Sequence, residues 1–168
     1  MNRIVVMGVS GCGKTTVGQG LAAALGGRFV DADDLHTDAA RAQMGAGMPL
    51  TDEDRAPWLV RVGQTLAAPP LPVVVACSAL RRRYRDAIRA SSGGDVLFLH
   101  LAGPRHIIAA RMALRRDHYM PVSLLDSQFA ALEPPEPDET FATLDLHDTE
   151  ADLIAAAVAA AASVREPG

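Results

Sequence analysis

Several residue types that mark other classes of protein are scarce in this sequence. Of 16 basic residues, 15 are Arg and only Lys14 is Lys, and Asn2 is the only Asn. The Asn-Lys-x-Asp motif with which GTP switches bind guanine therefore cannot be present. Aromatic residues make up only 4% of the chain, so the core must be built mainly from Ala, Val, Leu and Ile.

Cysteine and long apolar runs are scarce as well. Cys12 and Cys77 are too few for a disulfide framework, which favours a reducing, cytoplasmic location. The net charge of −4 provides no basic field for nucleic acid or an anionic membrane, so neither is expected as a partner. The longest apolar run, residues 153–162, is about half of what a membrane-spanning helix needs. We expect one globular domain over residues 1–168.

Short β-rich segments alternate with helical patterns along the chain. Strands are expected over residues 4–7, 28–31, 73–77, 96–101 and 140–146. Helices are expected over residues 14–25, 51–66, 79–90, 104–116, 122–132 and 149–164. Ser78 would cap the third of these helices, and Thr51 with Asp54 resembles a capping box at the start of the second. Such alternation predicts an α/β fold with a mainly parallel sheet covered on both faces.

One segment matches a phosphate-binding motif at every fixed position. Residues 8–15 read Gly-Val-Ser-Gly-Cys-Gly-Lys-Thr, which fits G-x-x-x-x-G-K-[ST] between a predicted strand and a predicted helix. The backbone N–H groups of such a loop form an anion-binding nest, and the helix dipole adds to it. Lys14 would reach the β- and γ-phosphates of a nucleotide, and the Thr15 hydroxyl would ligate Mg²⁺. The expected nucleotide-binding residues are Gly8, Ser10, Gly11, Cys12, Gly13, Lys14, Thr15 and Thr16.

Carboxylates follow the second expected strand rather than the third. The strand over residues 73–77 lacks the acidic residue that ends a typical Walker B strand, whereas Asp31, Asp33 and Asp34 follow Val30. Alternation along an extended segment places Asp31 and Asp33 on the same side. One of them could orient Mg²⁺ and the other could accept a proton from a substrate hydroxyl. The alternatives are a solvated acidic turn, or Asp34 as the cap of a following helix.

Two Arg-rich segments supply positive charge. Residues 78–86 carry four Arg in five positions at the start of an expected helix, where a small anionic substrate could bind, although some of these Arg must be surface residues. Residues 111–121 carry Arg111 and Arg115 on one helical face before a polar turn. Such a segment could be a lid that neutralises a transferring phosphoryl group and excludes water. The alternative is an ordinary Arg-rich helix end.

Several blocks together resemble the small bacterial-type gluconokinases. They are residues 7–14, Asp31-Ala-Asp-Asp-Leu-His36, Pro49-Leu-Thr-Asp-Glu-Asp-Arg-Ala-Pro-Trp-Leu59, Cys77-Ser-Ala-Leu-Arg-Arg-Arg-Tyr-Arg-Asp86 and residues 129–134. The resemblance spans about residues 4–145. It implies ATP-dependent phosphorylation of D-gluconate to 6-phospho-D-gluconate, usually by a homodimer. It also implies an adenylate-kinase-like three-layer sandwich with a five-stranded parallel sheet of order 2-3-1-4-5 and a helical lid near residues 115–122.

The motifs and the resemblance together lead to hypotheses about particular residues. Catalysis would depend on Lys14, Asp33 and Arg115, with Asp33 orienting or deprotonating the acceptor hydroxyl. Mg²⁺ would be held by Thr15 and Asp31, and Arg111 would join the nucleotide-binding residues. The expected gluconate-binding residues are Asp33, His36, Arg55, Ser78, Arg82 and Arg85. The gluconate carboxylate would pair first with Arg85 or Arg55.

Two alternatives to gluconate phosphorylation remain at this point. The first is a kinase for another small hydroxy acid such as shikimate, although shikimate kinases have a Gly-rich segment where this chain has Cys77-Ser78-Ala79. The second is a regulator that binds ATP without phosphorylating a metabolite. Carboxylates and Arg on the expected acceptor side favour a kinase.

Overall fold

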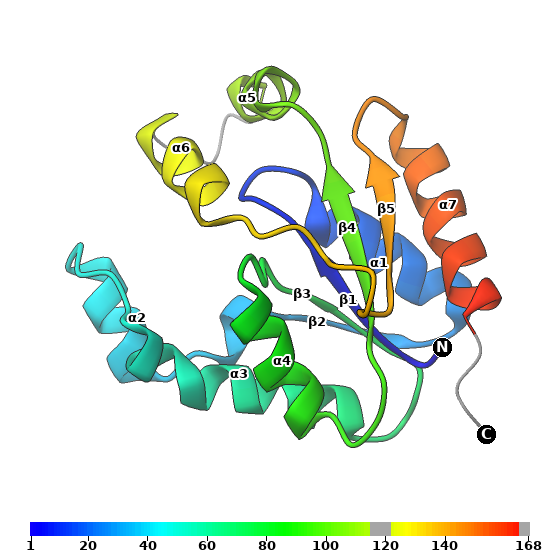
Figure 1. Ribbon diagram of the computed structural model, residues 1–168, viewed down its shortest axis with the longest axis horizontal. Coiled ribbons are helices and arrows are strands. Elements are labelled where there is room, and N and C mark those ends of the chain that lie inside the picture. Colours follow the sequence, from blue (N-terminus) through cyan, green and yellow to red (C-terminus); the bar gives the residue numbers. More distant parts are fainter. Residues whose placement is uncertain (115–121, 165–168) are drawn as a thin grey trace.

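The computed structural model describes residues 1–114 and 122–164 (Figure 1). Its strands are β1 (Arg3–Met7), β2 (Arg28–Asp31), β3 (Val73–Ala76), β4 (Leu97–Ala102) and β5 (Phe141–Asp145). They form one parallel sheet in the order β2-β3-β1-β4-β5, which confirms the expected class and strand order. Because β1 is central, the segment that leaves it lies in the middle of the sheet's carboxyl edge.

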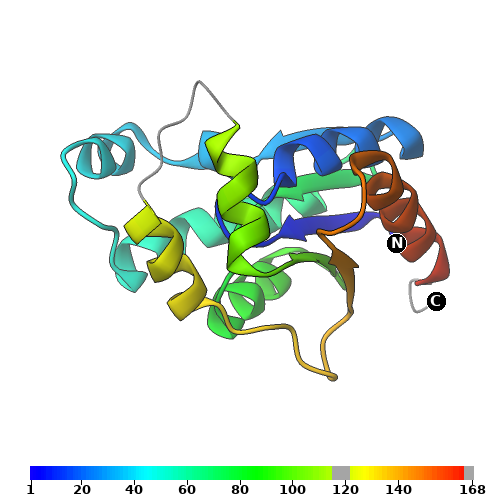
Figure 2. The same cartoon turned by 90° about the horizontal axis from the view of Figure 1, so that it is seen from above.

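Helices cover both faces of this sheet. The helical elements of the described residues are α1 (Lys14–Leu25), the 3-10 turn η1 (Ala32–Leu35), α2 (Asp38–Gly45), α3 (Asp52–Ala67), α4 (Arg82–Ser91), α5 (Arg105–Ala113), α6 (Val122–Ala131) and α7 (Glu150–Ser163). Helices α1 and α7 pack on one face and α3 and α4 on the other, as Figures 1 and 2 show from two sides. No helix in the described part of the chain is long and apolar enough to span a bilayer.

The apolar strands explain why the sheet lies between two layers of helices. Along β1, Ile4 and Val6 pack into the core beneath α1 and α7, whereas Val5 and Met7 pack into the core beneath α3 and α4. All four side chains are fully buried. A parallel strand that is covered on both faces is expected to be apolar throughout, because its side chains alternate between the two cores.

The capping prediction at Ser78 is wrong, because α4 begins at Arg82 and not at Ala79. The chain between β3 and α4 is an irregular loop in which Ala79 has a left-handed φ of +46°. The loop is held by the rest of the protein, since the Leu80 carbonyl accepts a hydrogen bond from the Glu133 N–H at 2.7 Å. The capping box at α3 is confirmed, with both reciprocal hydrogen bonds formed between Thr51 and Asp54. These bonds fix where α3 starts.

Helix α2 was not predicted. It has no buried residue, so no apolar periodicity marks it in the sequence. The Thr37 hydroxyl caps its start by accepting a hydrogen bond from the N–H of Ala40 at 3.1 Å. In Figure 1, α2 and α6 project from the molecule on either side of the edge where the strands end. These helices therefore flank the site.

Candidate active site

The phosphate-binding loop, residues 8–15, connects β1 to α1 at the centre of the sheet edge. Gly11 has a φ of +82°, which L side chains rarely adopt, and a Cβ there would lie 2.5 Å from Cγ of Met112. The Lys14 Nζ donates a hydrogen bond to the Gly8 carbonyl at 3.0 Å. The ammonium group therefore lies inside the curve of the loop, where a phosphate would bind.

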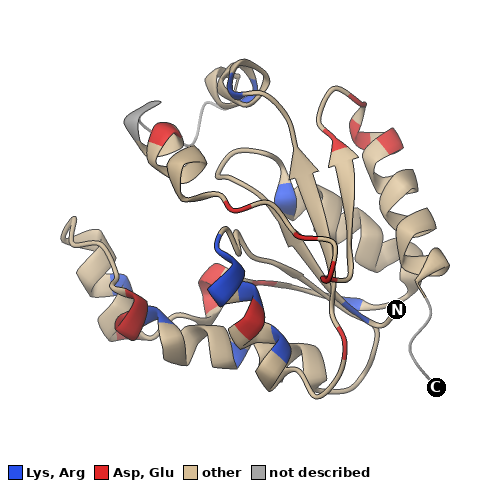
Figure 3. Cartoon of the chain, in the orientation of Figure 1, with Lys and Arg blue, Asp and Glu red and all other residues tan. Residues whose placement is uncertain are grey.

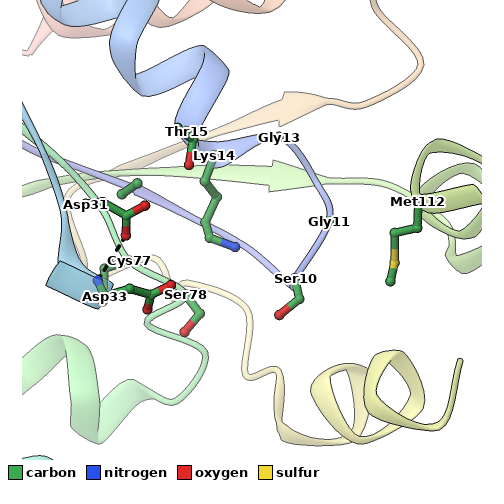
Figure 4. Close-up of a pocket in the computed structure, with 11 residues that line it drawn as sticks. Ser10, Gly11, Gly13, Lys14, Thr15, Asp31, Asp33, Cys77, Ser78 and Met112 are labelled. Carbon is green, nitrogen blue, oxygen red and sulfur yellow. Dashed lines mark hydrogen bonds between the residues drawn. The ribbon is translucent and has the colours of Figure 1, made fainter. Parts of the chain in front are cut away.

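A cavity of about 310 Å³ opens against this loop. Figure 4 shows the Lys14 side chain extending across it, with Asp31 and Asp33 on one side and Met112 on the other. Its lining residues are Ser10, Gly11, Gly13, Lys14, Thr15, Asp31, Asp33, Ala76, Cys77, Ser78 and Met112. The structure thus brings the predicted loop residues and the predicted carboxylate pair into one space, which we call the nucleotide cavity.

Three of the other predicted nucleotide-binding residues line a second cavity, whereas Gly8 lines neither cavity. Thr16 and Arg111 line this second cavity together with Cys12, whose side chain is fully buried. Arg111 donates a hydrogen bond to the Leu146 carbonyl at 2.6 Å, which connects α5 to the segment after β5. Arg115 and nearly all of the expected lid, residues 115–121, lie outside the described residues.

Asp31 and Asp33 are linked through the backbone. The Asp31 carboxylate accepts a hydrogen bond from the Asp33 N–H at 2.9 Å, which caps η1 and turns the chain toward the cavity (Figure 4). Burial and the neighbouring charge of Asp31 raise the pKa of Asp33, although His36 and Lys14 act in the opposite direction. A carboxylate with a raised pKa is a better proton acceptor than an ordinary one.

The oxygen atoms that line the nucleotide cavity suit a Mg²⁺ ion that is bound together with a nucleotide. Within residues 1–114 and 122–164, no group of three or more His, Cys, Asp or Glu is placed to hold a metal by itself. Mg²⁺ commonly takes one or two carboxylates and completes its shell with phosphate oxygens and water. The Thr15 hydroxyl and the Asp31 carboxylate line the same cavity and are oxygen donors of this kind.

A third cavity of about 340 Å³ lies beside the nucleotide cavity, and we call it the acceptor cavity. Its lining residues are Ser10, Asp33, His36, Met44, Pro49, Leu50, Arg55, Trp58, Leu59, Ser78, Ala79, Leu80, Tyr84, Gln128 and Ala131. Ser10, Asp33 and Ser78 line both cavities, so the two spaces meet at these residues. Four predicted substrate-binding residues, Asp33, His36, Arg55 and Ser78, gather here. Three polar or aromatic lining residues were not predicted, namely Trp58, Tyr84 and Gln128.

One wall of the acceptor cavity is an aromatic stack. The rings of His36 and Trp58 lie 4.3 Å apart at 10° to each other. The Trp58 indole N–H donates a hydrogen bond to the Ala32 carbonyl at 2.7 Å, which ties α3 to η1. Burial lowers the pKa of His36, although Asp33 acts in the opposite direction. The imidazole is therefore held toward its neutral form, as a flat wall rather than a cation.

Arg55 is the guanidinium that faces this cavity. It donates a hydrogen bond to the Tyr84 hydroxyl at 2.7 Å, and that hydroxyl donates to the Asp52 carboxylate, also at 2.7 Å. The Arg55 guanidinium also lies over the Tyr84 ring, 5.0 Å from its centroid. These contacts hold Arg55 in one orientation. A fixed guanidinium can bind a carboxylate with less loss of side-chain entropy than a mobile one.

The predicted substrate role of Arg85 is wrong. Its side chain is fully buried, and its Nε and Nη2 donate to the two carboxylate oxygens of Glu139 at 2.7 and 3.1 Å. The remaining nitrogen, Nη1, donates to the Ala79 carbonyl at 3.0 Å. Because its hydrogen bonds all go to the protein interior, Arg85 cannot receive a substrate carboxylate. Of the two Arg expected to bind that group, Arg55 remains.

The structure does not bring Arg82, the other predicted substrate-binding Arg of this segment, to the acceptor cavity. Its guanidinium forms a bidentate pair with Asp138 at 2.8 and 3.0 Å and lines none of the cavities described here. Its backbone N–H, at the start of α4, donates to the Glu133 carboxylate at 2.9 Å. The acidic loop before β5 lies beside the basic start of α4 in Figure 3. A carboxylate of the protein therefore already occupies the helix terminus that a substrate anion was expected to use.

Comparison with known proteins identifies the family of this chain. The family model for shikimate kinase matches residues 10–128. "Probable gluconokinase" of Mus musculus is 42% identical over 176 aligned positions, which cover 94% of this chain and 96% of the relative. "Thermosensitive gluconokinase" of Escherichia coli K12 is 46% identical over 138 positions, which cover 80% of this chain and 73% of the relative. The chain belongs to the gluconokinase family.

The fold of this chain is also that of a solved gluconokinase. The crystal structure of a gluconokinase from Sinorhizobium meliloti 1021 matches with a TM-score of 0.87 and 43% identity, covering 96% of this chain and 91% of that one. The match to the shikimate kinase model reflects the same α/β architecture. Gluconokinase membership makes this chain a P-loop kinase, an enzyme that binds a nucleotide and transfers a phosphoryl group.

Proposed function

We propose that this protein transfers the γ-phosphoryl group of ATP to D-gluconate and forms 6-phospho-D-gluconate and ADP. The observation that carries the proposal is the junction of two cavities, one built on the phosphate-binding loop and the other containing Arg55. The carboxylate of Asp33 lies where the cavities meet. The gluconokinase names of the relatives identify the acceptor.

The donor side is built from residues 8–15. Backbone N–H groups of the loop and the N-terminus of α1 bind the phosphates, and Lys14 balances the charge that develops on the γ-phosphoryl group. Thr15 and Asp31 would hold Mg²⁺, which neutralises phosphate charge when bound. Arg111 and Arg115 are proposed to contact the nucleotide and the transferring group, and the lid near residues 115–122 is proposed to exclude water.

Residues of the acceptor cavity orient gluconate by contacting both ends of the molecule. The gluconate carboxylate pairs with Arg55, so the chain of hydroxyl-bearing carbons extends toward Asp33 and the terminal hydroxyl faces the γ-phosphorus. That hydroxyl oxygen forms the new P–O bond while the bond between the γ-phosphorus and the β,γ-bridging oxygen breaks. Asp33 accepts the hydroxyl proton, and ADP leaves with the electron pair of the broken bond. We also propose that the enzyme is a cytoplasmic homodimer.

The direct test measures ADP release by the purified protein with MgATP and one candidate acceptor at a time. The acceptors are gluconate, shikimate and a nucleoside monophosphate, and a reaction without acceptor gives the background. We expect rapid ADP release with gluconate only, together with formation of 6-phosphogluconate. Equal ADP release with and without gluconate would instead identify a nucleotide-hydrolysing regulator, and preference for shikimate would reassign the acceptor.

A further inference from the structure

A residue of α6 contacts the phosphate-binding loop from the acceptor side. The Gln128 side-chain oxygen accepts two hydrogen bonds from Ser10, one from the backbone N–H and one from the hydroxyl, both at 3.2 Å. Ser10 lies at the crest of the loop and lines the nucleotide and the acceptor cavities, while Gln128 lines the acceptor cavity. The contact therefore lies where the two cavities meet.

Chemistry fixes which end of the Gln128 amide faces the loop. A backbone N–H can only donate, so the atom that meets the Ser10 N–H must be the carbonyl oxygen Oε1. The amide nitrogen Nε2 must then point away from Ser10. No residue in the described part of the chain accepts a hydrogen bond from Nε2. Gln128 thus offers two N–H donors that none of residues 1–114 and 122–164 uses.

We propose that Gln128 binds the acceptor through this amide nitrogen, which donates a hydrogen bond to the hydroxyl next to the one that is phosphorylated. For gluconate this is the 5-hydroxyl, so the inference rests on the proposed function. The assignment follows from position, because Gln128 is anchored at Ser10, which like Asp33 lines both cavities, whereas Arg55 is proposed to hold the carboxylate end. A neutral amide suits this place, since it can donate to a hydroxyl without adding charge beside the γ-phosphate.

The two hydrogen bonds to Ser10 also connect Gln128 to the phosphate-binding loop. The orientation of Nε2 depends on Oε1, and Oε1 is held by the same loop that holds the nucleotide phosphates. Binding of the acceptor and the conformation of the phosphate-binding loop are therefore coupled through one side chain. The amide nitrogen of Gln128 therefore binds the substrate, and its amide oxygen positions that nitrogen by its contact with Ser10.

Two variants separate these roles. Gln128→Glu keeps an oxygen that can accept both Ser10 hydrogen bonds but removes the N–H donors. Gln128→Met removes both functions at nearly the same side-chain length. The matched control is Ser127→Ala on the same helix, because the Ser127 hydroxyl is exposed and donates only within α6, to the Leu124 carbonyl at 2.8 Å. Thermal unfolding and nucleotide binding show whether each variant is folded.

The measurement compares KM and kcat for gluconate and for its 5-deoxy and 3-deoxy analogues. The parent protein and Ser127→Ala should use 5-deoxygluconate with a kcat/KM about tenfold lower than for gluconate, as expected for one lost hydrogen bond. In Gln128→Met this difference should shrink to within about twofold, because the partner of the 5-hydroxyl is gone. Gln128→Glu should lower kcat/KM for gluconate and leave the KM for ATP near the parent value, because it keeps the Ser10 contact but has no N–H donor for the hydroxyl. Discrimination against the 3-deoxy analogue should stay unchanged in all proteins.

Three outcomes would overturn the inference, and they can be told apart. If the parent protein uses 5-deoxygluconate as well as gluconate, Gln128 does not bind that hydroxyl. If Gln128→Met raises only the KM for ATP, the residue merely supports the loop. If the parent protein does not phosphorylate gluconate at all, the proposed function itself fails, and this inference fails with it.

Discussion

Arg85 and Glu139 form an ion pair inside the protein, and neither side chain is exposed to solvent. The pair joins α4 to the loop before β5 across 54 positions of sequence. The Glu139 carboxylate also accepts hydrogen bonds from Arg89 at 2.9 Å and from the Glu136 N–H at 2.7 Å. Burial alone would raise the pKa of Glu139, but these donors outweigh it and lower the pKa to about 2.

This ion pair should make stability depend on pH. Because the pKa of Glu139 in the folded protein lies below its ordinary value of 4.5, its contribution is complete above pH 4.5 and is lost as the pH falls toward 2. Replacing it by Gln leaves Arg85 buried without a charged partner, which should lower the free energy of unfolding by about 3–5 kcal/mol at pH 7. Urea unfolding between pH 7 and pH 3 should also show a flatter pH dependence for Glu139→Gln.

Asp138→Asn is the matched control for Glu139→Gln. Asp138 pairs with Arg82 in the same network, but its side chain is 67% exposed. An exposed pair contributes little to stability. Equal losses of stability in the two variants would show that burial of the Arg85–Glu139 pair is not what matters.

Lys14→Arg should give a folded protein with little kinase activity. The Lys14 ammonium donates to the Gly8 and Val9 carbonyl oxygens at 3.0 and 3.1 Å, within a tightly curved loop. A guanidinium is wider and planar, so it cannot take the same place around one phosphate. We expect kcat to fall by about 100-fold or more, with thermal unfolding close to the parent value. Near-normal turnover would mean that the only Lys of the chain is incidental to catalysis.

Asp33→Asn should lower kcat by about 10²- to 10⁴-fold while the nucleotide still binds, because the amide cannot accept the hydroxyl proton. The control is Asp34→Asn, since the Asp34 side chain is 78% exposed and lies 4.0 Å from Arg41. Steady-state kinetics with gluconate and nucleotide binding by calorimetry would measure both effects. Comparable kcat values in the two variants would remove Asp33 from the proton-transfer step.

Arg55→Gln should raise the KM for gluconate by about 10- to 100-fold and leave the KM for ATP nearly unchanged, because it removes a charge-assisted bond to the acceptor. Arg83→Gln is a close control. Like Arg55, which lies 3.3 Å from the Asp52 carboxylate, Arg83 pairs with Asp52 and lies over the Tyr84 ring, 5.5 Å from its centroid. Unlike Arg55, it does not line the acceptor cavity. If the two variants raise the KM for gluconate equally, Arg55 does not bind the carboxylate directly.

Local chemistry explains what could be predicted from the sequence. The phosphate-binding loop, the apolar strands and the capping box at Thr51 each depend on residues that are neighbours in sequence, and the structure contains all three. The order of the strands came from the resemblance to gluconokinases, since alternation alone leaves several orders open. Asp33 follows β2 at the carboxyl edge of the sheet, Arg55 lies in the first turn of α3, and both line the acceptor cavity.

The errors arose where a contact connects distant parts of the chain. Whether Arg85 faces a substrate or Glu139 cannot be deduced from residues 78–86, because the partner lies 54 positions away. The start of α4 was misplaced for the same reason, since Glu133 holds the preceding loop. Gln128 carries no local signal either, and only its contact with Ser10 identifies it.

The aromatic wall of the acceptor cavity also has an optical consequence. Trp58 is the only Trp in the chain, it stacks on His36, and it lines the space proposed for gluconate. The tryptophan fluorescence of the protein, which excitation near the red edge of the indole band separates from Tyr emission, therefore comes from one indole that lines the proposed acceptor space. Titration with gluconate, followed by the emission of that single fluorophore, can report acceptor binding without a label and without turnover.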